Sequence, residues 1–251
     1  MKSASLLTTL LFFTVGAFAQ TVITEAQYKT VRKKLAVEKD PVKRIDLLHL
    51  TARYYLEKDS ELKKYVDSAA LCNKQANDIS RKLGLKKRIV KSMLLDGHIA
   101  VKRNKDSLGF QIKNKALHYA RKHGLKKEEA DVYKSLGNDY CNAADIPKYV
   151  ACFNKAVQLY NKAGAFYEQA ETHALWARGY QIDDLLELST QQAKLAIAIK
   201  KQIKRPNIHT ELYCIAYNLQ LQGNLDQAQL YLLESPKNCG STGRCGLGND
   251  Y

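Results

Sequence analysis

Residues 131–157 read DVYKSLGNDYCNAADIPKYVACFNKAV, and this stretch decides the fold. Apolar residues return every three or four positions in its second half, as in Tyr149, Phe153 and Ala156, which is the period of one face of a helix. Polar and small residues at 142–145 interrupt that period and are typical of a turn. The stretch therefore predicts two helices joined by a short turn.

The rest of the chain shows the same helical period and no convincing strand alternation. Only 4 Pro and 13 Gly occur among 251 residues, too few for the frequent turns of a β-sandwich or barrel. The sequence therefore predicts an all-α chain.

The pattern recurs with a spacing of 40 residues. Small residues occupy two of the recurring positions, where helices are expected to approach closely: Ala76, Ala116, Ala156 and Ala196 at one, Gly97, Gly137 and Ala177 at the other. Aspartates recur at a spacing of 39, each just ahead of an apolar helical run and expected to cap a helix: Asp67, Asp106, Asp145 and Asp184. One helical hairpin cannot bury both of its apolar faces, so we expect the hairpins to stack into a solenoid.

The best repeat resembles a tetratricopeptide repeat (TPR). The family's aromatic, Leu-Gly, aromatic, turn and small residues fall on Tyr133, Leu136, Gly137, Tyr140, Asp145, Tyr149, Phe153 and Ala156. The resemblance implies an all-α, right-handed solenoid of stacked antiparallel helical hairpins over residues 41–235, in five units of which the last is incomplete. The usual unit has about 34 residues, so a spacing of 40 implies longer helices or loops.

The amino terminus has the features of a secretory signal peptide. Lys2 precedes an apolar run over 6–18, and Ala17-Phe18-Ala19 forms an A-x-A cleavage site. The run is shorter than the roughly 20 apolar residues that span a bilayer. We therefore expect residues 1–19 to be removed, and the mature protein to be periplasmic or secreted with no membrane insertion.

Residues 20–40 are expected to form an N-terminal capping helix over the first unit. Thr24 with Gln27 three residues later is a capping box, and Pro41 marks the break after the helix. A repeat array needs such a cover on its open apolar end.

The formal net charge of +15 favours anionic partners such as nucleic acid, acidic peptides or anionic membrane components. Export to a compartment without chromosomal DNA argues against nucleic acid. Basic clusters recur just past helix ends, at Lys86-Lys87-Arg88, Lys126-Lys127 and Lys204-Arg205. They either form an edge that recruits an anionic partner or complement the dipoles of helix C-termini.

No motif of catalysis is present: the sequence lacks H-E-x-x-H, G-x-S-x-G and the phosphate-binding G-x-x-x-x-G-K-[ST] loop. His118 and His123 are five residues apart, not the four that would place both rings on one helical face for a metal. Trp176 takes the place of the repeat's leucine and is expected in the core. We therefore expect a protein that is not an enzyme and carries no cofactor or metal.

The carboxyl end departs from the repeat pattern. Residues 236–251 are polar and Gly-rich, and we expect them to be disordered, with Cys239 and Cys245 able to form a disulfide. We expect a shortened version of a longer TPR protein with an apolar end exposed. The alternative is that the Cys239–Cys245 loop folds back as the cap.

In TPR proteins the first helix of each pair lines a concave groove. Carrying those positions over by the register of Gly97, Gly137 and Ala177 gives His98, Lys102, Lys134, Asn138, Asn142, Glu171, Arg178 and Gln181. Lys134 and Asn138 match the first part of a motif with which some family members hold a peptide's terminal carboxylate. The next units hold Leu175, Glu211 and Ile215 instead, so the match is partial.

Two classes of function fit these features. The first is an interaction scaffold whose groove binds a peptide or protein segment. The chain also resembles the extracytoplasmic TPR sensor regions of histidine kinases or helix-turn-helix regulators, which implies a role in signal transduction. The second class is a binder of, or an enzyme acting on, an anionic glycan or another envelope polyanion, as the basic clusters indicate.

Overall fold

The computed structural model describes residues 24–58, 63–205 and 207–234. Throughout these residues the regular structure is helical and contains no strand. The helices are α1 (Glu25–Val37), α2 (Pro41–Leu56), α3 (Lys63–Lys82), α4 (Lys86–Lys102), α5 (Asp106–Lys122), α6 (Lys126–Asn142), α7 (Ile146–Lys162), α8 (Phe166–Ile182), α9 (Leu186–Gln202), α10 (His209–Leu221) and α11 (Leu225–Glu234).

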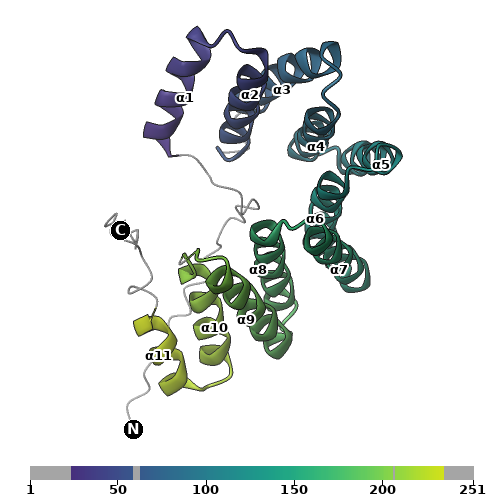
Figure 1. Ribbon diagram of the computed structural model, residues 1–251. Helices are drawn as coiled ribbons and strands as arrows, with labels where there is room; N and C mark the ends of the chain where they lie inside the picture. Colours follow the sequence, from purple (N-terminus) through teal and green to yellow (C-terminus); the bar gives the residue numbers. More distant parts are fainter. Residues whose placement is uncertain (1–23, 59–62, 206, 235–251) are drawn as a thin grey trace.

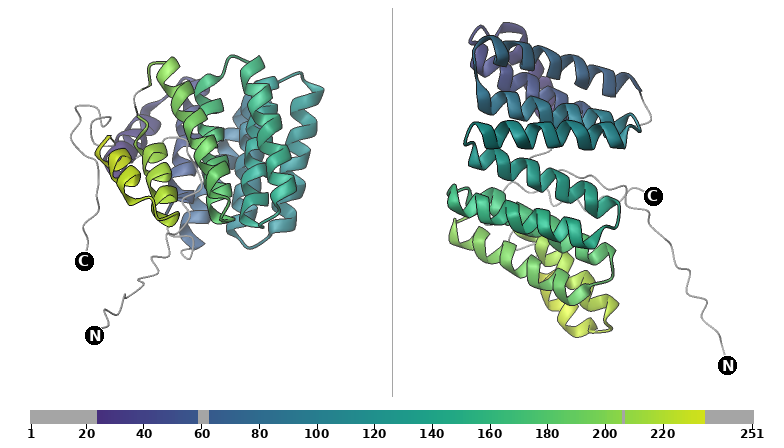
Figure 2. Two further views of the ribbon diagram at one scale, coloured as in Figure 1. Left: turned by 90° about the horizontal axis from the view of Figure 1, so that it is seen from below. Right: turned by 90° about the vertical axis from the view of Figure 1, so that its right-hand side faces the viewer.

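From α2 onward, consecutive helices pair as antiparallel hairpins that stack into an arc (Figure 1). The first helix of each pair, α2, α4, α6, α8 or α10, lies on the concave side, and the second helix lies outside it. Figure 2 shows the same stack from two other sides. The all-α solenoid of helical hairpins predicted from the sequence is confirmed.

The repeat of 40 residues is present in the backbone itself. Helices α4, α6 and α8 begin at residues 86, 126 and 166, and α5, α7 and α9 begin at residues 106, 146 and 186. Each of these helices has 17 residues. The longer unit thus comes from longer helices joined by short turns.

The turns between these helices share one conformation. Each contains a residue with positive φ, which is glycine in the turns before α4, α6 and α8 and Asn104, Ala144 or Asp184 in the turns before α5, α7 and α9. The backbone N–H after this residue donates to a carbonyl five positions back, as Leu125 does to Ala120. This left-handed residue ends one helix and lets the next begin at once.

The expected aspartate caps are mostly wrong. Asp145 caps α7, with its side chain accepting from the backbone N–H of Lys148. Asp67 lies inside α3, Asp106 is the first residue of α5, and Asp184 is the left-handed turn residue before α9. The aspartates recur at 39 residues while the turns recur at 40, so each aspartate lies at a different place in its repeat.

The recurring small residues mark the core as predicted. Ala76, Ala116, Ala156 and Ala196 are each 0% exposed. A Cβ atom at Gly137 would lie 2.8 Å from the ring of Phe153, so α6 needs a glycine there to approach α7. Trp176 is buried against Phe153 and Tyr180, which confirms its place in the core.

Helix α1 packs at the amino-terminal end of the arc (Figure 1). Thr24 and Gln27 form the predicted capping box, with both reciprocal hydrogen bonds present. The Tyr28 ring stacks on Tyr54 at a centroid distance of 3.9 Å, and its hydroxyl hydrogen-bonds with that of Tyr55 at 2.7 Å. These contacts fasten α1 to α2.

Several predictions fall on other parts of the chain. The signal peptide at 1–19, the tail at 236–251 and the pair Cys239 and Cys245 lie outside the described residues. Among the described residues, the cysteines Cys72, Cys141, Cys152 and Cys214 are free. None of the described helices is both long and apolar enough to cross a membrane.

Candidate functional site

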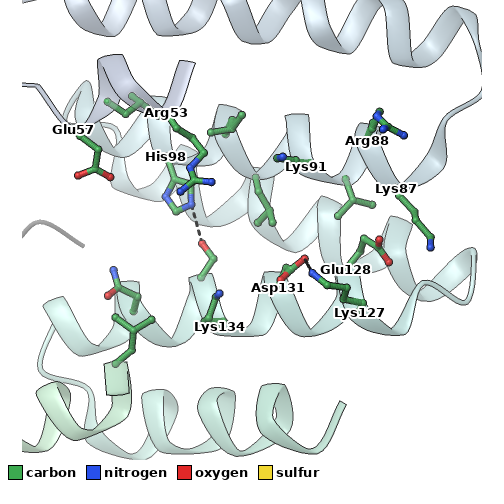
Figure 3. Close-up of a pocket in the computed structure, with 17 residues that line it drawn as sticks. Arg53, Glu57, Lys87, Arg88, Lys91, His98, Lys127, Glu128, Asp131 and Lys134 are labelled. Carbon is green, nitrogen blue, oxygen red and sulfur yellow. Dashed lines mark hydrogen bonds and ion pairs between the residues drawn. The ribbon is translucent and has the colours of Figure 1, made fainter. Parts of the chain in front are cut away.

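A pocket of about 300 Å³ opens on the concave side, between α2, α4 and α6 (Figure 3). Leu175 of α8 also lines it. Six basic side chains line it: Arg53, Lys87, Arg88, Lys91, Lys127 and Lys134. Three acidic side chains join them, Glu57, Glu128 and Asp131. Its apolar lining includes Leu56, Val90, Leu94, Leu95 and Leu175. The pocket is therefore an apolar hollow with an excess of positive charge.

Helical spacing places these side chains on one face. On α6, Asp131, Lys134 and Asn138 follow one another at three and four residues and line the pocket together. On α4, Lys91 and His98 line it two turns apart. The small residues of the same helices, such as Gly137, face the second helix of the hairpin and leave this face to the concave side.

Some of the cations are neutralised by the scaffold. The guanidinium of Arg88 donates to both carboxylate oxygens of Asp46 on α2, at 3.1 and 2.8 Å. The Lys127 amine lies 2.8 Å from Glu168 of α8 and 3.6 Å from Asp131. These pairs link successive hairpins along one rim of the pocket.

Lys91 and Lys134 differ from those cations. Both are half-buried in the pocket, and neither forms an ion pair with a carboxylate of the described residues. Burial lowers the pKa of each ammonium group, and the nearby Arg53 adds to this effect at Lys91. The Lys134 amine lies 5.6 Å from the centre of the Tyr160 ring. An anion in the pocket would relieve the desolvation of both charges.

His98 is neutral, and a hydrogen bond to Ser135 fixes its ring. Its Nε2 lies 3.3 Å from the Ser135 hydroxyl across the gap between α4 and α6. Burial holds the pKa of His98 well below its usual value, and the charge of Lys113 acts in the same direction. Figure 3 shows the Arg53 side chain beside this ring, with Lys134 pointing from α6 into the same space.

Further along the arc, Lys200, Glu171 and Glu211 form a buried cluster of charges that pair with one another. The Lys200 amine lies 2.8 Å from Glu171 and 2.7 Å from Glu211, and all three side chains are buried. Burial lowers the pKa of Lys200, but the two carboxylates outweigh it and hold the pKa above its usual value. This cluster joins α8, α9 and α10 and leaves no free cation.

The structure brings only part of the predicted groove set together. His98, Lys134 and Asn138 line the pocket, whereas Lys102, Asn142, Arg178 and Gln181 lie outside it. Gln181 is engaged within the scaffold, since its amide donates to the Asn218 side chain at 2.6 Å.

Sequence reasoning missed Arg53 and Lys91. The register contained a signal for Lys91, because the equivalent positions at steps of 40 residues are Asp131, Glu171 and Glu211. A charge of opposite sign at one unit of a repeat marks that unit as different. Arg53 lies in the first hairpin, where the spacing is less regular.

The basic clusters lie a few residues past the ends of α3, α5 and α9, as predicted, whereas Phe166 and Tyr167 follow the end of α7. Lys86 and Lys126 are also the first residues of α4 and α6, so these clusters both follow one helix and begin the next. A cation in the first turn opposes the helix dipole, and the explanation by dipole complementarity is therefore wrong there. Lys204 and Arg205 lie in the turn before α10, with Arg205 over the Tyr167 ring.

No protein-family model matches this chain, and no curated protein matches it. Among solved structures, it is similar to the crystal structure of BtubC (BKLC) from P. vanneervenii. The TM-score is 0.63 and the identity 11%, over 85% of this chain and 90% of that one. At this identity the likeness shows the fold alone, a helical protein of stacked helix pairs.

Proposed function

We propose that this protein is an exported TPR-like interaction scaffold that binds a segment of a partner protein on its concave side. One observation carries the proposal: the pocket between α2, α4 and α6, with two half-buried lysines that the scaffold does not neutralise. Solenoids present extended concave surfaces suited to polypeptide segments, and such binding needs no catalytic group. The export signal predicted at 1–19 supports a partner in the periplasm or outside the cell.

The regular backbone supports the TPR-like assignment. Helices pair as hairpins through short turns, and Gly137 lies at the close contact of α6 with α7, as the family's pattern requires. The helices of 17 residues make the unit longer than the family's usual one. By the same resemblance, a role as the sensor part of a signalling protein is a specific form of this proposal.

A blocked pocket tests the proposal. Asn138→Trp places a large ring in the pocket, whereas Asn154→Trp makes the same change at an exposed position of α7. Mature wild-type protein and the Asn154 variant should recover the same partner from a native envelope extract, and the Asn138 variant should lose it. Equal recovery by all three proteins would place the binding surface elsewhere.

The excess of basic side chains favours a second candidate, a binder of an anionic glycan or another envelope polyanion. Under this alternative, the protein should bind polyanion resin and recover no stable protein partner. Binding should then fall steeply with salt and depend on the exposed lysines as much as on those of the pocket.

A further inference from the structure

The acidic residues at one repeat position each have a hydrogen-bond or ion-pair partner in the scaffold. Asp131 accepts a hydrogen bond from the Tyr160 hydroxyl at 2.5 Å. Forty residues further on, Glu171 pairs with Lys200, which itself lies 40 residues beyond Tyr160. Glu211 continues the acidic series and shares the same lysine. In the hairpins of α6 with α7 and of α8 with α9, the fold thus places an acid on the concave helix and a donor on the outer helix, and Glu211 of α10 uses the donor of the preceding hairpin.

In the hairpin of α4 and α5 this arrangement is broken at both positions. Lys91 replaces the acid, and the residue equivalent to Tyr160 and Lys200 is Ala120, which is fully buried and has no polar side-chain atom. The nearest equivalent acid, Asp131, forms its contacts with Tyr160 and Lys127. The scaffold therefore supplies no carboxylate that pairs with Lys91 among the described residues.

A second half-buried lysine of the pocket, Lys134, projects from the neighbouring helix α6 (Figure 3). Two apolar side chains line the same pocket as the lysines, Leu94 on α4 and Leu175 on α8. A volume of about 300 Å³ is at the small end of ligand pockets and suits a few side chains rather than a folded domain. The pocket thus combines two cationic points with apolar surface.

We propose that the pocket selects partner segments in which acidic side chains flank an aliphatic side chain. The carboxylates pair with Lys91 and Lys134, and the aliphatic side chain rests on Leu94 and Leu175. This inference rests on the proposed function and names the chemistry of the segment that is bound. The other units carry an acidic residue of their own at the position of Lys91. In this unit, the carboxylate of the bound segment would supply the acidic group beside Lys91.

The pocket's own acids decide between a carboxylate and a more highly charged anion. Glu57, Glu128 and Asp131 line the same space and repel negative charge. A phosphate group would place nearly two negative charges beside these three side chains, where a carboxylate places one. The balance of cations and acids thus favours singly charged side chains of a polypeptide.

Two short peptides with blocked ends test the proposal by fluorescence anisotropy. The first alternates Glu with Leu, and the second has Gln in place of each Glu. We expect the Glu peptide to bind at least about tenfold more tightly, because a hydrogen bond to a charged carboxylate is stronger than one to a neutral amide. A third peptide with Gln and a free carboxyl end measures any contribution of the terminal carboxylate.

Methionine substitutions identify the cations involved. Lys91→Met and Lys134→Met keep an apolar stem and remove the charge, so each should weaken binding of the Glu peptide by about tenfold. Lys115→Met, at an exposed position of α5, is the matched control and should leave affinity within about twofold. If either pocket variant fails to fold, a charge swap serves instead: Lys91→Glu should prefer a Lys and Leu peptide over the Glu one.

Equal affinity for the Glu and Gln peptides, or no binding of either, would overturn the inference. Equal effects of the Lys91 and Lys115 changes would also overturn it, since they would indicate general electrostatic attraction. The proposed function is tested separately, because loss of a captured partner through Asn138→Trp needs no acidic segment. A partner that the Asn138 variant loses and the lysine variants keep would support the scaffold function and refute the chemistry inferred here.

Discussion

The repeat position at residues 91, 131, 171 and 211 differs between the two halves of the concave side. In the carboxyl-terminal half, Glu171 and Glu211 are buried and share Lys200 at 2.8 and 2.7 Å. In the amino-terminal half, the same position is Lys91, which lines an open pocket and has no ion pair within the described residues. The first arrangement is completed by the scaffold, whereas the second is left for a ligand to complete.

This difference separates charges that stabilise the fold from charges available for binding. A buried ion cluster in which each partner depends on the others is sensitive to the removal of one member. A half-buried lysine that pairs with no scaffold carboxylate adds little to stability and costs desolvation. Mutations at the two positions should therefore affect different properties.

The largest expected effect is on stability, in the closed half. Lys200→Met would leave Glu171 and Glu211 buried without a cation, and we expect a loss of about 3–5 kcal/mol in the free energy of unfolding. Lys91→Met removes no partner from a carboxylate, so we expect a change below about 1 kcal/mol. Urea denaturation at neutral pH measures both.

A triple variant checks the cause of that loss. Combining Lys200→Met with Glu171→Gln and Glu211→Gln removes the buried charges together, so much of the stability should return. A similar loss in the Lys91 and Lys200 single variants would contradict the distinction between the halves.

The sequence predicted the hairpins well because their contacts repeat. Small residues such as Ala156 and Gly137 lie where two helices touch, and this local requirement recurs every 40 residues. The caps were predicted poorly, because a residue with positive φ sets each helix boundary. This residue is glycine in some turns and Ala144 or Asp184 in others. Nothing in the identity of Ala144 indicates that backbone conformation.

The site was predicted only in part for a different reason. Helical register places His98, Lys134 and Asn138 on the concave side, and the structure finds them in the pocket. Register does not show which charges the scaffold neutralises. Glu171 was equally plausible as a groove residue until Lys200, 29 residues away in sequence, was found beside it. The distinction depends on partners from other helices.

The next largest effect is also on stability, at the repeat position that holds Gly137 in α6 and Ala177 in α8. Gly137→Leu would force a side chain into the Phe153 ring, and we expect overpacking to cost about 1–3 kcal/mol. The equivalent residue of α8 is Ala177, where the packing already accepts a methyl group. There Ala177→Gly should also destabilise, by about 1 kcal/mol, because glycine weakens a helix interior. An unchanged melting temperature for Gly137→Leu would show that this contact is not close.

A third effect is the acid sensitivity of the amino-terminal half. His49 is fully buried between α2 and α4, with Nε2 2.8 Å from the Ser92 hydroxyl, and burial lowers its pKa from 6.5 to about 3. The folded state therefore stays unprotonated while the unfolded chain takes up a proton. The stability that depends on neutral His49 is complete above pH 6.5 and falls as the pH drops toward 3.

From pH 7 to pH 5 this one group should cost about 2 kcal/mol of unfolding free energy, at about 1.4 kcal/mol per pH unit below the unfolded pKa. His49→Asn removes the titrating group and should flatten the pH dependence by that amount. Urea denaturation at both pH values gives the difference between the two proteins. Parallel pH profiles would show that His49 is not the source of acid sensitivity.

The smallest expected effect tests whether both halves share one backbone turn. Ala144, in the hairpin of α6 and α7 between the two halves, is exposed and has φ of +54°, a conformation that is costly for a residue with a Cβ atom. The turns before α4, α6 and α8 have glycine at the equivalent place. Ala144→Gly should therefore stabilise the protein by about 1 kcal/mol, as a rise in the urea midpoint. Asp184→Gly should gain less, because a short polar side chain tolerates this conformation better. A loss of stability at Ala144 would mean that glycine's freedom in the unfolded chain outweighs the strain, and the two halves would then differ in their turns as well as in their charges.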